Sequence, residues 1–281
     1  MNMDKNDPDI AQILTSSEGN ITLYAPHTLD KMRAAGRLAA ETLDYLTPFV
    51  KIGISTLELD TLAHDFIIQH NAIPAPLNYK GFPKSICTSI NHVICHGIPD
   101  ARVKLKSEDI INIDVTVILD GWYGDTSRMF YVGKVKKKAS RLVEVTFNAL
   151  WKGIEAVKPG NTTGDIGFAI ENYVKEFNYG IVRDFCGHGL GKKFHDNPGI
   201  MHYGKQGGGV KLVPGMYFTI EPMINTGTHR ARILPDEWTA ITADRGLSAQ
   251  FEHSMAVTET GVEIFTKSPK GWDCPPYDGS E

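Results

Sequence analysis

Four carboxylates and one histidine in this sequence have the types and the spacing of a metal-ligand set. Carboxylate-rich sites bind divalent ions such as Mn²⁺, Co²⁺, Fe²⁺ or Zn²⁺, and a bridging carboxylate can hold two ions close together. If the five side chains converge in the fold, the chemistry that they support is metal-assisted hydrolysis. The candidate ligands are Asp114, Asp125, His188, Glu221 and Glu252.

The elements that carry the two aspartates are predicted to be the strands of one β-hairpin. Residues 109–132 alternate apolar and mixed positions on both sides of Asp120-Gly121, and an Asp-Gly pair between such runs is a strong signal for a two-residue turn. With this turn, Asp114 and Asp125 lie diagonally across one face of the hairpin, near enough to share ions. The alternative is that both aspartates face solvent on an ordinary amphipathic hairpin.

The register of this hairpin separates a polar face from an apolar one. Asp114 is expected to face Ser127, and Asp125 is expected to face Thr116. Asn112 shares that polar face. The side chains expected to point the other way, into a core, are Ile111, Ile113, Val115, Val117 and Leu119.

Both candidate glutamates are embedded in apolar runs that are typical of buried strands. Glu221 lies within residues 216–224, and Glu252 lies within residues 248–257. A buried carboxylate needs a partner or a metal ion. The alternative for Glu221 is a salt-bridged residue at a strand end, and Pro222 after it indicates a sheet edge or a local irregularity.

Three histidines are candidates for a role at the site. His188 lies in the glycine-rich residues 185–195, which predict irregular backbone rather than a helix interior. His195, with Asp196 beside it, could donate a hydrogen bond to a substrate carbonyl. His96 follows an apolar strand and precedes a turn, so it is a candidate for moving protons. An ordinary loop histidine is the alternative for His188 and His195.

An internal repeat suggests two similar halves. Two short segments recur 107 residues later, and Asp114 and Glu221 have the same separation. Two such halves would pack about a pseudo-two-fold axis, with the site at their seam. The recurring segments are 50–56 with 157–163, and 103–105 with 210–212. The helix-like stretches that flank them are 29–49 and 57–69 in the first half, and 142–156 and 166–177 in the second.

Composition limits the class of protein. The chain has 281 residues, a mass of 31.0 kDa, 42% hydrophobic and 22% charged residues, which suit one large globular domain or two small ones. A net charge of −4 and a pI near 6.2 argue against a general nucleic-acid binder. No apolar run approaches a membrane span, and the polar, acidic start resembles neither a secretory signal nor a transit peptide.

Cysteine usage indicates reduced thiols in a cytosolic protein. The four cysteines form neither a CxxC pair nor a zinc-like spacing. They are Cys87, Cys95, Cys186 and Cys274. Residues 1–26 are expected to form a flexible N-terminal tail, and residues 270–281 a C-terminal tail.

Together these residues resemble the type I methionine aminopeptidases of bacterial or organellar character. The resemblance covers about residues 29–269. It implies an α/β (α+β) pita-bread fold over residues 27–269, in which helices lie outside a curved antiparallel sheet. Its pseudo-symmetric halves would span about 29–135 and 140–265. The matching motifs are residues 84–99 (KSICTSINHVICHGIP), 112–125, 186–198, 221–222 and 247–253.

The resemblance also implies roles for the candidate residues at a site with two divalent ions. Asp125, His188 and Glu252 would hold one ion and Asp114 the other, with Asp125 and Glu252 helping to bridge. Glu221 would bind one ion and act as general base. His195 would stabilise the oxyanion. His96 would hold the scissile nitrogen or relay protons. A monovalent cation, Na⁺ or K⁺, would bind at Asn91, Val93 and Ser248.

The implied activity is removal of the initiator methionine from nascent polypeptides whose second residue is small. A hydroxide that bridges the two ions would attack the first peptide bond. The implied protein is a cytoplasmic monomer with a transient ribosome contact, and it binds no specific nucleic acid or membrane. Pro76 stands where some bacterial members have a pocket cysteine. The residues implied to line the methionine and substrate pocket are Tyr79, Phe82, Cys87, His96, Phe194, His195 and Trp238.

Three other interpretations compete with this one. A prolidase or proline aminopeptidase shares the fold, but such enzymes usually carry an additional N-terminal domain. A pita-bread module that only binds other molecules would typically lose metal ligands, whereas all five are present here. A structural protein with accidental carboxylates does not explain glutamates within apolar strands.

Overall fold

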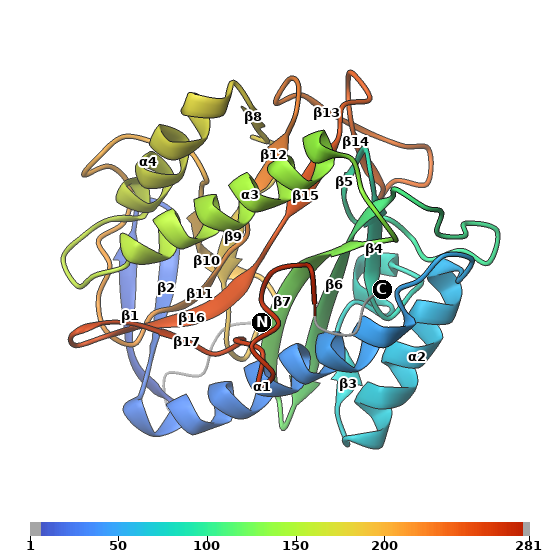
Figure 1. Ribbon diagram of the computed structural model, residues 1–281. Coiled ribbons are helices and arrows are strands. Elements are labelled where there is room, and N and C mark those ends of the chain that lie inside the picture. The colour runs from blue at the N-terminus through green and yellow to red at the C-terminus, as the bar shows by residue number, and fades with distance from the viewer. Residues whose placement is uncertain (1–6, 278–281) are drawn as a thin grey trace.

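Antiparallel sheets covered by helices make up the molecule (Figure 1). In the computed structural model, which describes residues 7–277, the first half contains α1 (Leu29–Leu46) and α2 (Thr56–Gln69). The second half contains α3 (Lys137–Glu155) and α4 (Thr163–Val174). Figure 1 shows α3 and α4 along the upper part and α1 and α2 along the lower part, with the strands between them. Short 3₁₀ turns lie at Pro26–Thr28, Thr47–Phe49, Tyr79–Gly81 and Lys175–Phe177.

The expected pita-bread architecture is confirmed by the way the sheets are arranged. In the first half, β6 pairs with β7 on one edge and with β3 and β4 on the other. These strands are β3 (Ile73–Pro74), β4 (Cys87–Ile90), β6 (Ile110–Leu119) and β7 (Trp122–Tyr131). The five-stranded sheet of the second half has the order β10 (Asp196–Ile200), β9 (Gly187–Gly189), β11 (Tyr217–Ile220), β16 (His253–Thr258) and β17 (Gly261–Ile264).

Two smaller sheets complete the body. One has the order β15 (Ser248–Gln250), β12 (Met223–Asn225) and β8 (Gly180–Ile181). The other has the order β13 (Ala231–Ile233), β14 (Ala240–Thr242) and β5 (Val93–Cys95), and so joins the two halves.

Two backbone hydrogen bonds recur at the spacing of the predicted repeat. Gly53 N donates to Leu105 O at 2.8 Å, and Gly160 N donates to Leu212 O at 3.0 Å. Every residue of the second contact is numbered 107 higher than its counterpart in the first. The caps of α2 and α4 are equivalent as well, because each helix begins with a capping box, formed by Ser55 with Glu58 and by Thr162 with Asp165.

The predicted hairpin has the predicted register. Asp114 pairs with Ser127 and Thr116 with Asp125, without a bulge. Asp120 and Gly121 form the turn with φ of 50° and 81°, and two positive φ values are what a type I′ turn requires. The apolar side chains of β6 are buried in a core with α1 and α2, as expected. These core residues are Ile111, Ile113, Val115 and Val117.

The expected flexible N-terminal tail is wrong for the part of it that the structure describes. β1 (Ile10–Ser16) and β2 (Gly19–Tyr24) form an antiparallel hairpin. Ile21 and Leu23 are buried in the core of the second half. Burial of these apolar side chains holds the end of the segment against the body. Residues 1–6 lie outside the described residues.

The expected C-terminal tail is likewise packed against the body up to residue 277. Tyr277 is buried, its hydroxyl donates to Met129 O at 2.7 Å, and its ring meets Phe130 edge-on. Residues 278–281 lie outside the described residues. Within residues 7–277, no helix has the length and apolar character needed to cross a membrane.

Candidate metal centre

The hairpin brings the two aspartates to one face, as the register predicted. Asp114 on β6 pairs with Ser127 across to β7 and with Cys87 across to β4. Asp125 on β7 is 3% exposed, and Thr116 Oγ1 donates to its Oδ1 at 2.7 Å. Both carboxylates therefore lie on the buried polar face of the sheet rather than in solvent.

The two glutamates occupy equivalent breaks between strands of the second half. Glu221 lies between the end of β11 at Ile220 and the start of β12 at Met223, and Pro222 cannot donate a ladder hydrogen bond there. Glu252 lies between β15 and β16. Its backbone N donates to Ser127 O at 3.1 Å, which attaches this segment to β7. Both side chains leave the regular pleat and can turn toward the hairpin.

His188 lies on a short strand, which corrects the expectation of irregular backbone. The segment Gly187–Gly189 forms β9, because glycine permits a very close approach to the neighbouring strand. A Cβ atom at Gly187 would lie 2.3 Å from Thr219 O. The glycines therefore serve close strand packing on both sides of the histidine.

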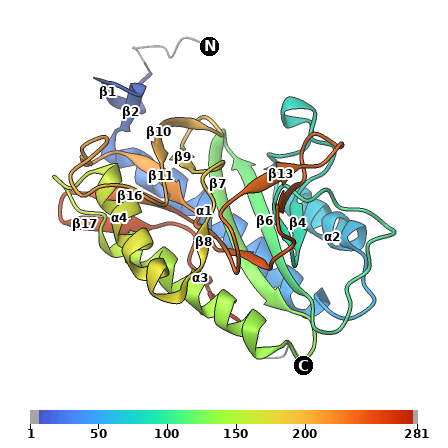
Figure 2. The same cartoon turned by 90° about the horizontal axis from the view of Figure 1, so that it is seen from above.

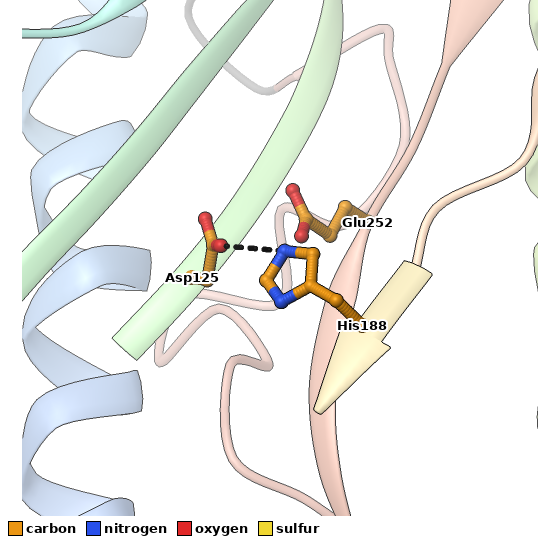
Figure 3. Close-up of side chains that lie close together, drawn as sticks. All are labelled: Asp125, His188 and Glu252. Atoms are coloured by element: carbon orange, nitrogen blue, oxygen red, sulfur yellow. Dashed lines mark ion pairs between the residues drawn. The ribbon is translucent and has the colours of Figure 1, made fainter. Parts of the chain in front are cut away.

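The five candidate ligands converge on one cavity. One ligand atom each from Asp125, His188 and Glu252 lies within 4.8 Å of the other two, and Figure 3 shows these side chains directed toward one another. His188 Nε2 is 3.6 Å from Asp125 Oδ2 and 3.6 Å from Glu221 Oε1. All five side chains, Asp114 included, line a cavity of about 380 Å³.

Burial and mutual repulsion dominate the electrostatics of the site. Burial raises the pKa of Asp114 to about 7. Burial, and then repulsion by Asp125, raises the pKa of Glu221 and of Glu252 well above the ordinary value. Burial, and then repulsion by Asp114, does the same for the pKa of Asp125. Four buried carboxylates thus disfavour one another's negative charge.

His188 has the neutral form that a metal ligand requires. Burial lowers its pKa to about 4, so the ring is neutral at physiological pH. Its Nδ1 is 3.1 Å from Gly189 O, and Nδ1–H donates there. The lone pair of Nε2 then faces the carboxylates of Asp125 and Glu221.

The side chains present fit divalent cations. Within residues 7–277, no lysine or arginine forms an ion pair with any of the four carboxylates. Asp114 Oδ1 is buried without a hydrogen-bond partner among those residues. Buried carboxylates need compensating positive charge, and oxygen ligands with one imidazole suit Mn²⁺, Co²⁺, Fe²⁺ or Zn²⁺.

Both other predicted histidines line the same cavity. His96 follows β5 with φ of 56°, and burial lowers its pKa. Burial, and then the neighbouring His188, lowers the pKa of His195 to about 3. His195 Nδ1 is 2.9 Å from Tyr79 Oη, and its ring centroid is 4.2 Å from that of His188. The two rings thus border the ligand set as neutral imidazoles.

The predicted pocket residues surround the rest of the cavity. Phe82 meets Trp238 edge-on at 5.2 Å between ring centroids, and Tyr79 is 4.7 Å from Phe194. Cys87 and Pro76 line the same space, as the sequence suggested for Cys87. Lining residues that sequence reasoning missed are Lys80, Cys95, Asp184, Phe185, Cys186 and Met223. Phe185, Cys186 and Met223 lie within three residues of a candidate ligand, a signal that could have found them.

Gln250 and His202 also contact Glu221, and sequence reasoning missed both. Gln250 Nε2 donates to Glu221 Oε2 at 3.2 Å, and Glu221 N donates to His202 Nε2 at 3.1 Å. His202 is fully buried, and burial lowers its pKa to about 3, so it stays a neutral acceptor. His202 had no recognisable motif around it.

The residues predicted for a monovalent cation lie apart from the ligand cavity. Ser248 N donates to Asn91 O at 2.7 Å, and Val93 begins β5 two residues after Asn91. Ser248 Oγ is buried without a partner among residues 7–277. The cation itself stays a prediction.

Comparison with known proteins relates this geometry to a family. A family model described as metallopeptidase family M24 matches residues 30–259. The chain is 59% identical over 258 residues to the methionine aminopeptidase of Rickettsia prowazekii, an alignment that covers 92% of this chain and 99% of that protein. It is 58% identical over 246 residues to methionine aminopeptidase A of Synechocystis, covering 88% of this chain and 97% of that protein.

Solved structures agree with the sequence comparison. The methionine aminopeptidase of Thermotoga maritima matches with a TM-score of 0.86 at 34% identity, over 88% of this chain and 99% of that chain. The prolidase of Pyrococcus horikoshii matches with a TM-score of 0.67 at 20% identity, over 88% of this chain and 63% of that chain, which shows the shared fold alone. The extent of the family match and the identity to whole relatives lead to one conclusion: the chain belongs to metallopeptidase family M24.

Proposed function

We propose that this protein is a metal-dependent aminopeptidase that removes the N-terminal methionine from polypeptides whose second residue is small. The observation that carries the proposal is a set of buried carboxylates and one neutral imidazole, His188, beside an apolar pocket. The high identity to whole relatives that bear the name methionine aminopeptidase supports the choice of substrate. The substrates would be nascent chains, so we expect the protein to act in the cytoplasm.

The geometry supports the proposed ligand set. Asp125, His188 and Glu252 would hold one divalent ion. Asp114 would hold a second, together with Asp125 and Glu252, which the two ions would share. When bound, such ions polarise a carbonyl oxygen and make a water molecule acidic enough to give hydroxide near neutral pH. Glu221, whose Oε1 is 3.6 Å from His188 Nε2, would complete the set.

Glu221 is the proposed general base. Thr219 Oγ1 donates to its Oε1 at 2.9 Å, and Gln250 Nε2 donates to its Oε2 at 3.2 Å, so the carboxylate has a fixed orientation. A carboxylate in a fixed orientation can accept a proton from a water molecule beside it. It would take the proton of the attacking water and deliver it to the leaving amine.

His195 and His96 are the proposed contacts to the peptide bond. Tyr79 Oη is 2.9 Å from His195 Nδ1. If the hydroxyl donates to Nδ1, then Nε2 carries the proton and can donate to the carbonyl oxygen as it gains negative charge. His96, which lines the same cavity from the segment after β5, would hold the scissile nitrogen.

The pocket suits a thioether side chain. Its aromatic and sulfur-containing walls, with Phe82, Cys87 and Trp238 among them, give an apolar and polarisable surface. Methionine makes favourable contacts with aromatic ring edges, so it gains more from such a pocket than a polar side chain does.

Hydrolysis of Met-Ala-Ser tests this function. The protein would be stripped of metal and then assayed alone and after adding Mn²⁺, Co²⁺, Fe²⁺ or Zn²⁺. We expect metal-restored release of free methionine from Met-Ala-Ser and little release from Met-Leu-Ser, the control for a large second residue. Cleavage of an Xaa-Pro peptide instead would favour the prolidase reaction. No release with any ion, despite stoichiometric binding, would favour a module that only binds other molecules.

A further inference from the structure

The loop between β9 and β10, residues 190–195, carries two side chains into the cavity. Phe194 and His195 both line it. The loop begins after Gly189, the last residue of β9, and it ends at His195, directly before β10 begins at Asp196. Its position relative to the ligand set therefore fixes where His195 can reach. Backbone hydrogen bonds attach the loop to β7 and β11, from Tyr123 N to Gly191 O at 2.9 Å and from Leu190 N to Tyr217 O at 3.0 Å. The N-terminal segment supplies further contacts at Gly191 and Lys192.

Tyr24, at the end of β2, packs against the loop and is hydrogen-bonded to it. Its side chain is buried, and its hydroxyl accepts a hydrogen bond from Lys192 N at 3.0 Å. The loop lies directly on the ring, because a Cβ atom at Gly191 would be 2.4 Å from Tyr24 ring atoms. The ring is itself fixed by stacking on Tyr217 at 4.9 Å between centroids and by an edge contact with Trp122.

Asp9, just before β1, holds the side chain of the same lysine. Asp9 is 6% exposed, and its Oδ2 is 2.5 Å from Lys192 Nζ. Its other oxygen is 2.9 Å from Lys31 Nζ on α1 and 2.9 Å from His27 Nε2. The hydrogen bond to Lys192 lowers the pKa of Asp9 far below the ordinary value, so the carboxylate keeps its charge. Asp7 adds a second ion pair to Lys192 at 2.8 Å.

The hairpin of β1 and β2 also contacts β10, the strand that comes directly after the loop. Thr22 Oγ1 donates to Asp196 Oδ2 at 3.4 Å, and Asn197 Nδ2 donates to Asn20 O at 3.3 Å. Figure 2 shows β1 and β2 at the edge of the molecule, beside β10. The N-terminal segment thus contacts the loop and the strand after it.

We propose that the N-terminal segment, residues 7–24, positions the loop that carries Phe194 and His195, with Lys192 and Tyr24 as the positioning residues. The proposal rests on the proposed function, because the readout is His195-dependent turnover. Lys192 and Tyr24 line no part of the cavity and would act only through the loop. If the segment only anchored the N-terminus to the body, its loss would change the stability of the fold but not the turnover.

Lys192→Met and Tyr24→Phe test this proposal in the full-length, metal-loaded protein with Met-Ala-Ser. Lys192→Met removes the ion pairs to Asp9 and Asp7, Tyr24→Phe removes the hydrogen bond to Lys192 N, and each keeps most of the side-chain volume. We expect kcat to fall about tenfold, because small displacements of a group that contacts the reacting atoms are costly. Lys31→Met is the matched control, since Lys31 binds the same carboxylate of Asp9 but contacts no residue of the loop. Its kcat should stay within about twofold of the unchanged protein.

A double-mutant cycle distinguishes positioning of His195 from mere anchoring of the N-terminal segment. In a His195→Ala background, Lys192→Met should change kcat by less than about twofold, because the group that it positions is gone. Equal losses in both backgrounds, or equal losses for Lys192→Met and Lys31→Met, would overturn the proposal.

Hydrogen exchange of the backbone amides over residues 190–196 tests the same contacts without turnover. We expect faster exchange in Lys192→Met and Tyr24→Phe than in Lys31→Met. If the unchanged protein releases no methionine, the proposed function fails, and exchange still decides whether this segment holds the loop. Unchanged exchange in both loop variants would contradict the proposal.

Discussion

The contact between Tyr79 and His195 links the Tyr79 hydroxyl to the choice of protonated ring nitrogen in His195. Tyr79 Oη is 2.9 Å from His195 Nδ1, and the two rings lie 5.2 Å apart in a stacked arrangement. A hydroxyl that donates to Nδ1 leaves Nε2 protonated and able to donate to an oxyanion. Sequence reasoning assigned Tyr79 to the methionine pocket only, and the structure gives it a second contact.

Removal of this hydroxyl should lower turnover without loss of metal. In Tyr79→Phe the ring contacts with Phe194 remain, but the histidine loses the group that fixes its tautomer. We expect kcat on Met-Ala-Ser to fall about 10- to 100-fold, with metal content unchanged. Tyr123→Phe is the control, because the Tyr123 ring stacks on Phe194 at 5.6 Å but does not contact His195. A larger effect at Tyr123 would refute the role given to Tyr79.

Asp125 is, with Glu252, one of the two carboxylates that both proposed ions would share. In Asp125→Asn, Thr116 Oγ1 can still donate to the side-chain oxygen, so the local fold should persist. One ligand charge is lost, and we expect metal binding to weaken and kcat/KM to fall at least about a thousandfold. Metal content by elemental analysis, measured beside turnover, checks this expectation. Near-normal turnover would exclude the proposed ligand set.

At the scale of elements, the hairpin of β6 and β7 packs very closely against α1 at Gly124. A Cβ atom at Gly124 would lie 2.2 Å from Ala35 O on α1. Gly124 directly precedes Asp125, so the helix and the ligand share one short segment of β7. The turn glycine, Gly121, has open space around its Cβ position and φ of 81°.

Gly124→Ala should therefore disturb both the fold and the site. The added methyl group must separate α1 from β7, which we expect to cost about 1–3 kcal/mol of unfolding free energy. Because Asp125 moves with the strand, metal affinity should fall as well. Gly121→Ala is the control: its positive φ costs about 1 kcal/mol, but its site is distant from the ligands. Thermal unfolding and metal titration of both variants measure the two effects, and unchanged affinity in Gly124→Ala would contradict the coupling.

Elements with strong local signals were predictable from sequence, and those that depend on distant partners were not. The Asp120-Gly121 turn fixed the register of two strands, and apolar periodicity located all four long helices. The hairpin at residues 10–24 was missed because the partners that fix it, such as β10, lie far along the chain. The candidate ligands followed from residue type and context, whereas the contacts of Lys192 and His202 depend on tertiary packing that periodicity does not encode.

At the scale of the whole molecule, the candidate centre joins the two halves. Asp114 comes from the first half, and Glu221 is its counterpart 107 residues later. Glu252 N donates to Ser127 O at 3.1 Å, which connects the second half to β7 beside Asp125. Without cations, four buried carboxylates repel one another across this junction. Metal binding should consequently stabilise the entire fold and not only the site.

The pH dependence of this stabilisation has a definite sign. The metal-free protein holds Asp114 with a pKa raised from 3.8 to about 7, whereas the unfolded chain titrates near the ordinary value. Between these values the folded state binds more protons, so the stability of the metal-free protein falls as pH rises from about 4 to about 7. Asp125, Glu221 and Glu252 have raised pKa values and add to this loss.

Bound metal keeps these carboxylates deprotonated and compensated, so the metal-loaded protein should lack that loss. The difference in Tm between the two forms should thus widen as pH rises from 5 to 7.5. At a free-ion concentration of about 100 times Kd, binding adds about 2.7 kcal/mol, or roughly 5–10 °C for a chain of this length. Calorimetry with and without Mn²⁺ at both pH values measures the difference, and Asp125→Asn should reduce it. An equal gap at both pH values would mean that these carboxylates do not bind the ion.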